Sequence, residues 1–67
     1  MEIEIRVNGT DERLPECTIE ALVADKKLVA ASLVVEHNGR IVKQTEWSKV
    51  MLRQGDVLEL LNFVGGG

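Results

Sequence analysis

Few side chains in this sequence could carry chemistry. Its 67 residues include one histidine, His37, one cysteine, Cys17, and no tyrosine, whereas an enzyme site needs several converging acids, bases, nucleophiles or metal ligands. His37 stands beside an Asn-Gly pair and is predicted to be a solvated loop residue. Cys17 precedes a predicted helix and is expected to serve packing. The sequence therefore predicts a protein that is not an enzyme and binds neither a metal nor a cofactor of its own.

The remaining reactive group is the carboxylate that follows three glycines, Gly65, Gly66 and Gly67. A glycine backbone can pass close to the walls of a narrow pocket because it carries no side chain. A carboxylate is unreactive until it is activated, for example as an acyl-adenylate, which a sulfur nucleophile can then attack. We expect residues 65–67 to form a flexible tail, with Gly67 as the reacting residue and Gly65 and Gly66 as the part that enters a partner's channel. The alternative is an ordinary frayed terminus.

The segment before this tail, residues 57–64, is predicted to be the last strand. Alternation along it places Leu58 and Leu60 on one face and Leu61 and Phe63 on the other. Exposed apolar residues beside a functional tail indicate a contact with a partner protein. We therefore expect Leu61 and Phe63 to bind a partner, unless the chain itself covers them.

Further segments of regular structure must position this strand. Alternation predicts a strand over residues 2–7, and Asn8-Gly9 predicts a tight turn into a second strand around residues 11–14. Thr18 can cap a helix over residues 19 to about 26. Strands are predicted on both sides of Asn38-Gly39, over residues 33–37 and 40–43. Residues 45–52 fit no single pattern, and Gly55-Asp56 is typical of a turn.

This order of elements predicts an α+β domain in which one helix packs across a mixed sheet, with the first and last strands parallel at its centre. We place the folded domain at residues 1–64 and the glycine tail at residues 65–67. Trp47 is assigned to packing. The other expected core residues are apolar and lie on the inward faces: Ile3, Ile5, Leu22, Leu58 and Leu60.

Composition and charge limit the partners. Eight Lys and Arg against eleven Asp and Glu give a net charge of −3, and only Trp47 and Phe63 are aromatic. A nucleic-acid site would need a basic patch and stacking platforms, so nucleic acid is excluded as the expected partner. The apolar runs are too short for a membrane span. A single cysteine fits a reducing cytoplasm, where we expect the protein to be located.

Several short motifs together resemble the ThiS family of sulfur carrier proteins, which are β-grasp relatives of ubiquitin. The resemblance covers nearly the whole chain and implies a ubiquitin-like β-grasp fold. It also implies that Gly66 and Gly67 occupy the family's functional positions. The motifs that carry it are Thr18-Ile19 with Leu22, Asn38-Gly39 before Ile41-Val42, Glu46-Trp47, Leu52 with Gly55-Asp56, and the ending Phe63-Val64-Gly65-Gly66-Gly67.

The resemblance further implies a function in thiamine biosynthesis. An E1-like adenylating enzyme would use ATP to activate Gly67, sulfur would convert it to a thiocarboxylate, and thiazole synthase would take that sulfur for thiazole formation. Three alternatives remain open. They are the carrier that forms the small subunit of molybdopterin synthase, a ubiquitin-like protein modifier, and a plain protein-binding module. The short chain and Glu46-Trp47 favour the thiamine branch, and the absence of arginine from residues 60–67 departs from the ubiquitin tail.

Overall fold

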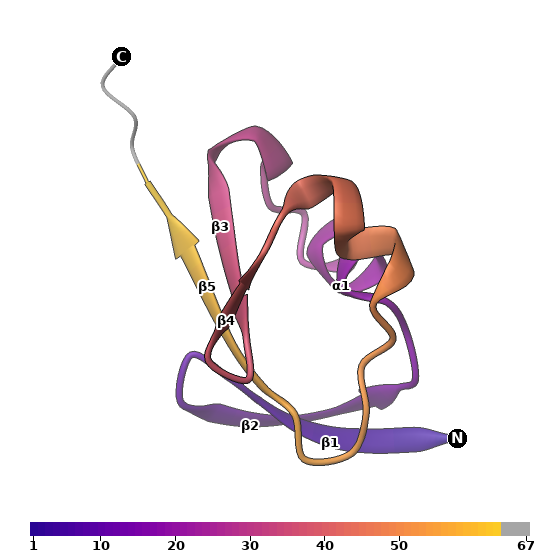
Figure 1. Cartoon of the computed structure of the whole chain (residues 1–67). Helices are drawn as coiled ribbons and strands as arrows, with labels where there is room; N and C mark the ends of the chain where they lie inside the picture. The colour runs from indigo at the N-terminus through magenta and orange to yellow at the C-terminus, as the bar shows by residue number, and fades with distance from the viewer. Residues whose placement is uncertain (64–67) are drawn as a thin grey trace.

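The computed structural model describes residues 1–63 of the chain as one sheet with a helical layer on one face (Figure 1). The glycine tail and the domain boundary predicted after residue 64 lie outside these residues. The strands are β1 (Glu2–Val7), β2 (Thr10–Pro15), β3 (Leu33–His37), β4 (Arg40–Val42) and β5 (Val57–Asn62). The helices are α1 (Ile19–Asp25) and two 3-10 helices, η1 (Ala30–Ser32) and η2 (Gln44–Lys49).

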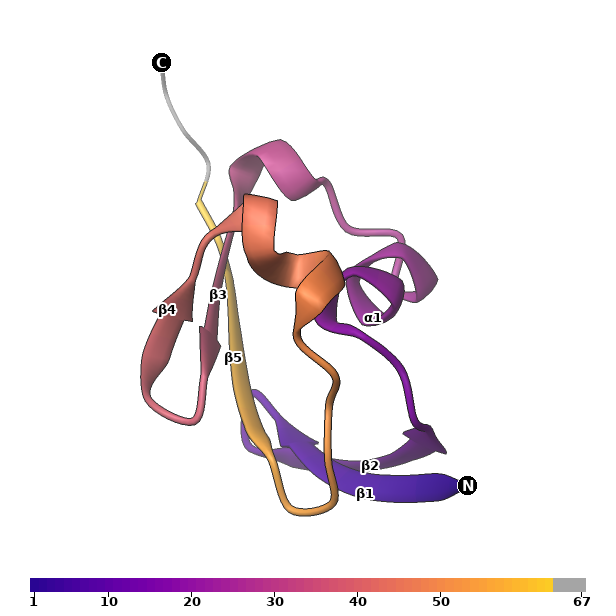
Figure 2. The same ribbon diagram turned by 45° about the vertical axis from the view of Figure 1, so that its right-hand side comes forward.

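The five strands form one mixed sheet in the order β2-β1-β5-β3-β4. The first and last strands, β1 and β5, pair in parallel at its centre, with Val7 opposite Leu58, and the other neighbours are antiparallel. This arrangement confirms the predicted α+β fold with a mixed sheet crossed by one helix. Figures 1 and 2 show α1 and the coil of residues 44–49 on the same side of the sheet. No helix of residues 1–63 therefore covers the other face of β3 and β5.

Local sequence explains most of the elements. Burial alternates along β1 residue by residue, so Ile3, Ile5 and Val7 face the core. Asn8 and Asn38 have φ values of 50° and 51°, and each is followed by a glycine that also has positive φ, as tight hairpin turns require. The Thr18 hydroxyl accepts a hydrogen bond from the Ala21 amide at 3.1 Å and caps α1 as predicted.

The core lies between α1, η2 and the inner face of the sheet. Its buried residues include all five that were predicted: Ile3, Ile5, Leu22, Leu58 and Leu60. Trp47 is also buried, and its indole Nε1 donates a 2.8 Å hydrogen bond to the Val42 carbonyl oxygen. This bond satisfies the one polar group that burial of the tryptophan takes from water. Residues 45–49 of the ambiguous segment thus belong to a 3-10 helix that carries a core residue, whereas residues 50–52 lie beyond it.

The structure shifts some predicted boundaries. β2 begins at Thr10 and ends at Pro15, one residue beyond the prediction at each end. β5 ends at Asn62, so Phe63 lies beyond the strand that was predicted to run to residue 64. β4 ends at Val42, because Lys43 becomes the N-cap of η2.

Candidate functional site

The two faces of β5 differ sharply in exposure. Leu58 and Leu60 are buried, whereas Leu61 is 57% exposed and Phe63 is 54% exposed. Leu61 therefore lies on the exposed face of β5 as the alternation predicted, and Phe63 is exposed directly after the end of the strand. Their role in binding a partner stays a prediction. They lie just before the glycines at which the chemistry is expected, but Gly65, Gly66 and Gly67 lie outside the described residues.

The end of β5 is held on its β1 side by Asn8. The Asn8 side chain accepts a hydrogen bond from the Leu60 amide at 2.7 Å and donates one to the Leu60 carbonyl oxygen at 3.2 Å. The Asn8 amide itself donates to the carbonyl of Leu58 at 2.9 Å. The Asn8 side chain thus pairs with Leu60 as a further residue of β1 would. The hydrogen bonding between β1 and β5 therefore continues two residues beyond Leu58, the last paired residue of β5. The sequence pattern predicted only a turn at Asn8, because its side-chain partner lies 52 residues away and leaves no local signal.

The other side of β5 is held by β3 and the residue before it. The pairing runs to Leu33 opposite Asn62, and the Phe63 amide donates to the Ser32 carbonyl oxygen at 3.0 Å. The Ser32 hydroxyl also donates to Oδ1 of Asn62 at 2.9 Å. The backbone is therefore fixed as far as Phe63, four residues before Gly67.

The start of β5 is fixed by the Asp56 carboxylate, which has three hydrogen-bond partners. His37 Nε2 lies 2.8 Å from Oδ2, the Arg53 amide donates to Oδ2 at 2.9 Å, and Asn38 Nδ2 donates to Oδ1 at 3.1 Å. The Asn38 side chain in turn accepts from the Val57 amide at 2.8 Å. The network ties the β3–β4 turn to the first residue of β5.

This network corrects the prediction for His37. The residue ends β3, its side chain is only 21% exposed, and it pairs with Asp56, so it is not a solvated loop residue. Its partner lies 19 residues away, and no local pattern could reveal it. Partial burial on its own raises the pKa of Asp56. The hydrogen bonds from His37, Asn38 and the Arg53 backbone, together with the charge of His37, outweigh that effect and hold the pKa below its ordinary value.

Cys17 packs against the core beside an open pocket of about 230 Å³ that Leu14, Ala21 and Leu22 help to line. Desolvation, and to a smaller extent the charge of Asp25, raises the pKa of the thiol above its ordinary value. A raised pKa leaves little of the reactive thiolate at neutral pH. The structure thus agrees with a packing role for this cysteine.

Two further properties of residues 1–63 bear on the site. No group of three or more His, Cys, Asp and Glu side chains in this range is arranged to hold a metal ion. No helix in the same range is long and apolar enough to cross a membrane. The arrangement that the structure does offer is a strand fixed at both ends that carries an exposed leucine, Leu61, on its outer face and precedes the glycines in the chain.

This chain is similar in sequence to known proteins. The sequence is 34% identical over 65 residues to the sulfur carrier protein ThiS of Bacillus subtilis, a match that covers 94% of this chain and 98% of that protein. It is also 30% identical over 66 residues to a thiazole synthase of Paramagnetospirillum magneticum, where the match covers 97% of this chain. This chain spans only 20% of the length of that second relative.

Solved structures show the same fold. The crystal structure of the thiamine biosynthesis protein ThiS from Geobacter metallireducens superposes with a TM-score of 0.84 at 26% identity, covering 97% of this chain and 100% of that one. A solution structure of a thiamine biosynthesis protein from the same organism gives a TM-score of 0.80, also at 26% identity, over 97% of this chain and 88% of that one. The fold is thus the ubiquitin-like β-grasp. The model of the ThiS family matches residues 5–67, and this chain therefore belongs to the ThiS family.

Proposed function

We propose that this protein is a sulfur carrier of thiamine biosynthesis whose reacting group is the carboxylate of Gly67. The observation that carries the proposal is the extent of the family match, which runs from residue 5 through the last glycine. The near full-length similarity to the Bacillus subtilis carrier supports the same function. The protein is then a substrate of its partner enzymes and catalyses no step itself.

The proposed chemistry has two steps at one carbon atom. An E1-like adenylating enzyme binds ATP, and a carboxylate oxygen of Gly67 attacks the α-phosphorus, which gives an acyl-adenylate and releases pyrophosphate. A sulfur nucleophile then attacks the acyl carbon, AMP leaves, and the terminus becomes a thiocarboxylate. The carrier holds no cofactor, since the ATP belongs to the activating enzyme. The thiocarboxylate sulfur is a soft nucleophile that is largely ionised near neutral pH.

The described residues would contribute by positioning the tail. Leu61 and Phe63 would dock on the activating enzyme, and Gly65 and Gly66 would pass through its channel. An extended chain advances about 3.3 to 3.6 Å per residue, so the four steps from Phe63 to Gly67 span at most about 14 Å. A partner that binds Phe63 would therefore confine the Gly67 carboxylate to a small volume. The carboxylate then has less orientational freedom to lose when it reaches the adenylation site.

Thiazole synthase is the proposed acceptor of the sulfur. The similarity between this chain and part of a Paramagnetospirillum protein named thiazole synthase supports that pairing. A reducing cytoplasm, in which the lone Cys17 would stay a thiol, is the proposed compartment. The small subunit of molybdopterin synthase and a ubiquitin-like modifier share the activation step, so the acceptor reaction distinguishes the three functions.

The test is adenylation by the E1-like enzyme from the same organism, measured as ATP-pyrophosphate exchange. Wild-type protein should support exchange, whereas a variant with one alanine added after Gly67, or Gly66→Trp, should not. Both variants should melt at the wild-type temperature, because the core and the hydrogen bonds that hold the sheet lie within residues 1–63. After complete sulfur transfer, the intact mass should show one oxygen replaced by sulfur. Normal exchange in either variant would overturn the proposal, as would isopeptide formation in place of sulfur delivery to thiazole synthase.

A further inference from the structure

The outer face of the sheet, on the side away from α1, carries apolar side chains from three neighbouring strands. Val34 of β3 lies directly opposite Leu61 of β5, and Ile41 of β4 lies on the same face, opposite Glu36. Val34 is half-buried, whereas Leu61 is 57% exposed and Ile41 is 70% exposed. We call Val34, Ile41 and Leu61 the outer patch. Val34 and Leu61 are direct cross-strand neighbours, Ile41 lies diagonally from Val34 on β4, and Leu61 is near the end of β5. Exposed apolar residues grouped in this way are typical of a protein contact surface.

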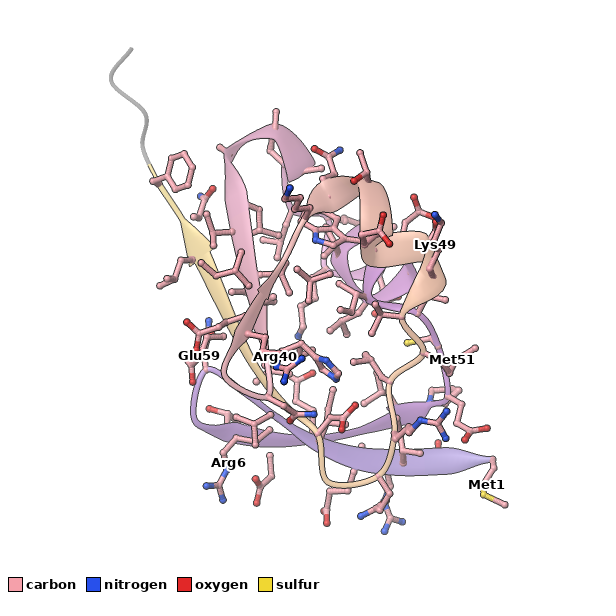
Figure 3. The ribbon with its side chains drawn as sticks, in the orientation of Figure 1. Met1, Arg6, Arg40, Lys49, Met51 and Glu59 are labelled. Carbon is pink, nitrogen blue, oxygen red and sulfur yellow. The ribbon has the colours of Figure 1, made fainter. Side chains whose placement is uncertain are left out.

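Two glutamates interrupt this apolar face. Glu36 of β3 and Glu59 of β5 are cross-strand partners, directly opposite each other in the antiparallel pairing. We call them the acidic pair. Both are half-buried, and Figure 3 shows the Glu59 side chain projecting from β5 on the side away from α1. Side chains that face each other across antiparallel strands have Cβ atoms about 4.5 to 5.5 Å apart, so the two glutamates leave the backbone side by side on the same face.

Within residues 1–63, no cationic side chain forms an ion pair with either glutamate of the acidic pair. Across residues 1–63 the ion pairs join Arg6 to Asp11, Lys26 to Glu12, His37 to Asp56 and Lys49 to Glu46, and none involves Glu36 or Glu59. No hydrogen-bond donor from a side chain in that range reaches either carboxylate. Like charges directly opposite on a sheet are destabilising. The pair therefore costs the free protein stability, and a cation bound between the two carboxylates would reverse that cost.

These observations also indicate which kind of molecule is able to bind to the outer face of the sheet. A second copy of the chain would bring its own acidic pair and its own net charge of −3 against this one, so charge opposes self-association through the outer patch. A nucleic acid would meet the same repulsion from its phosphates. A protein surface that combines apolar side chains with an arginine or lysine is complementary to both the outer patch and the acidic pair.

We infer that the outer patch docks on the adenylating enzyme of the proposed function, and that an arginine or lysine of that enzyme binds between Glu36 and Glu59. This inference rests on the proposed function. It adds that the partner contributes a positively charged side chain, and that Glu36 and Glu59 select for it. Half-buried carboxylates strengthen such a contact, because docking removes the remaining water and lowers the local dielectric. Bidentate contact with a guanidinium would also fix the register of the two proteins, and with it the direction in which the tail leaves.

The test compares two double variants that remove the same charge. Glu36→Gln/Glu59→Gln neutralises the acidic pair. Glu2→Gln/Glu16→Gln neutralises two exposed glutamates near the far end of the β1–β2 hairpin, neither of which makes an ion pair within the described residues. Carrier-dependent adenylation is measured for both and for wild type between low and high salt, alongside thermal melts.

Neutralising the acidic pair should have opposite effects on stability and docking. We expect Tm to rise by about 2 to 4 °C as the cross-strand repulsion disappears. The KM for the carrier should rise about tenfold at low salt with kcat unchanged, and its salt dependence should weaken. The control variant should keep the wild-type KM and salt dependence. A residue that only supports the fold would not raise Tm and KM together.

Two outcomes would overturn the inference without touching the proposed function. One is wild-type adenylation with an unchanged KM in Glu36→Gln/Glu59→Gln. The other is a wild-type dimer, seen by sedimentation, that Leu61→Asp dissociates, since that result would assign the outer patch to a second copy. Failure of the wild-type protein to be adenylated at all would instead overturn the proposed function, and this inference with it.

Discussion

Replacing Asn8 tests whether a turn side chain holds the strand that leads to the tail. Asn8→Gly removes both hydrogen bonds to Leu60 and leaves the turn intact, because glycine adopts the φ of 50° found here without strain. Asn8 therefore offers a substitution that separates its side-chain contacts from its backbone conformation.

The expected cost follows from the two bonds. A neutral intramolecular hydrogen bond contributes about 0.5 to 1.5 kcal/mol net, so the pair contributes about 1 to 3 kcal/mol. The bond to the Leu60 carbonyl is long at 3.2 Å, and an open groove of about 410 Å³ that both residues line gives water access to the freed groups. We therefore expect a loss of about 1.5 kcal/mol in the free energy of unfolding, and a Tm lower by about 6 to 12 °C in a domain of this size.

Urea unfolding gives the global loss, and amide hydrogen exchange places it on the strand. Exchange at the Leu60 amide should accelerate more than exchange in the β3–β4 ladder, because only the Leu60 amide loses its acceptor. Wild-type stability together with a protected Leu60 amide would show that water replaces the asparagine at no cost, and would refute the reasoning that Asn8 holds the end of β5. A uniform acceleration at all amides would refute its local part.

Three other substitutions test the Asp56 anchor of the strand and its exposed residues Leu61 and Phe63. The lowered pKa of Asp56 means that its carboxylate stabilises the fold above the unfolded-state pKa of about 3.9, and that this contribution is lost as pH falls through the lower folded-state value. Asp56→Asn should thus cost about 1 to 2 kcal/mol at pH 7 and progressively less toward pH 2, measured by urea unfolding across that range; a cost independent of pH would contradict the role of the His37 pair. Leu61→Asp and Phe63→Asp should each raise the KM of carrier-dependent adenylation about tenfold with an unchanged circular-dichroism melt, whereas a lowered melting temperature with unchanged kinetics would assign both residues to packing.

Much of the fold could be predicted from the sequence because the responsible interactions are local. The alternation of β1, the Asn-Gly turns and the Thr18 cap each depend on residues within four positions of one another. The same locality predicted the exposed face of β5, since alternate residues of a strand point in opposite directions. The glycine tail could be predicted because three consecutive glycines identify it by composition alone, without any knowledge of contacts.

What the sequence alone determined, then, is the set of elements, their inward faces and the residue types available for chemistry. Only the tertiary structure decided which side chains meet, because that depends on strands paired across long separations in the chain. Asn8 reaches Leu60 across 52 positions and His37 reaches Asp56 across 19, and neither pairing leaves a periodic signal. Glu36 and Glu59 become neighbours only through the register of β3 and β5, and a shift of that register by one residue would turn one of them to the opposite face.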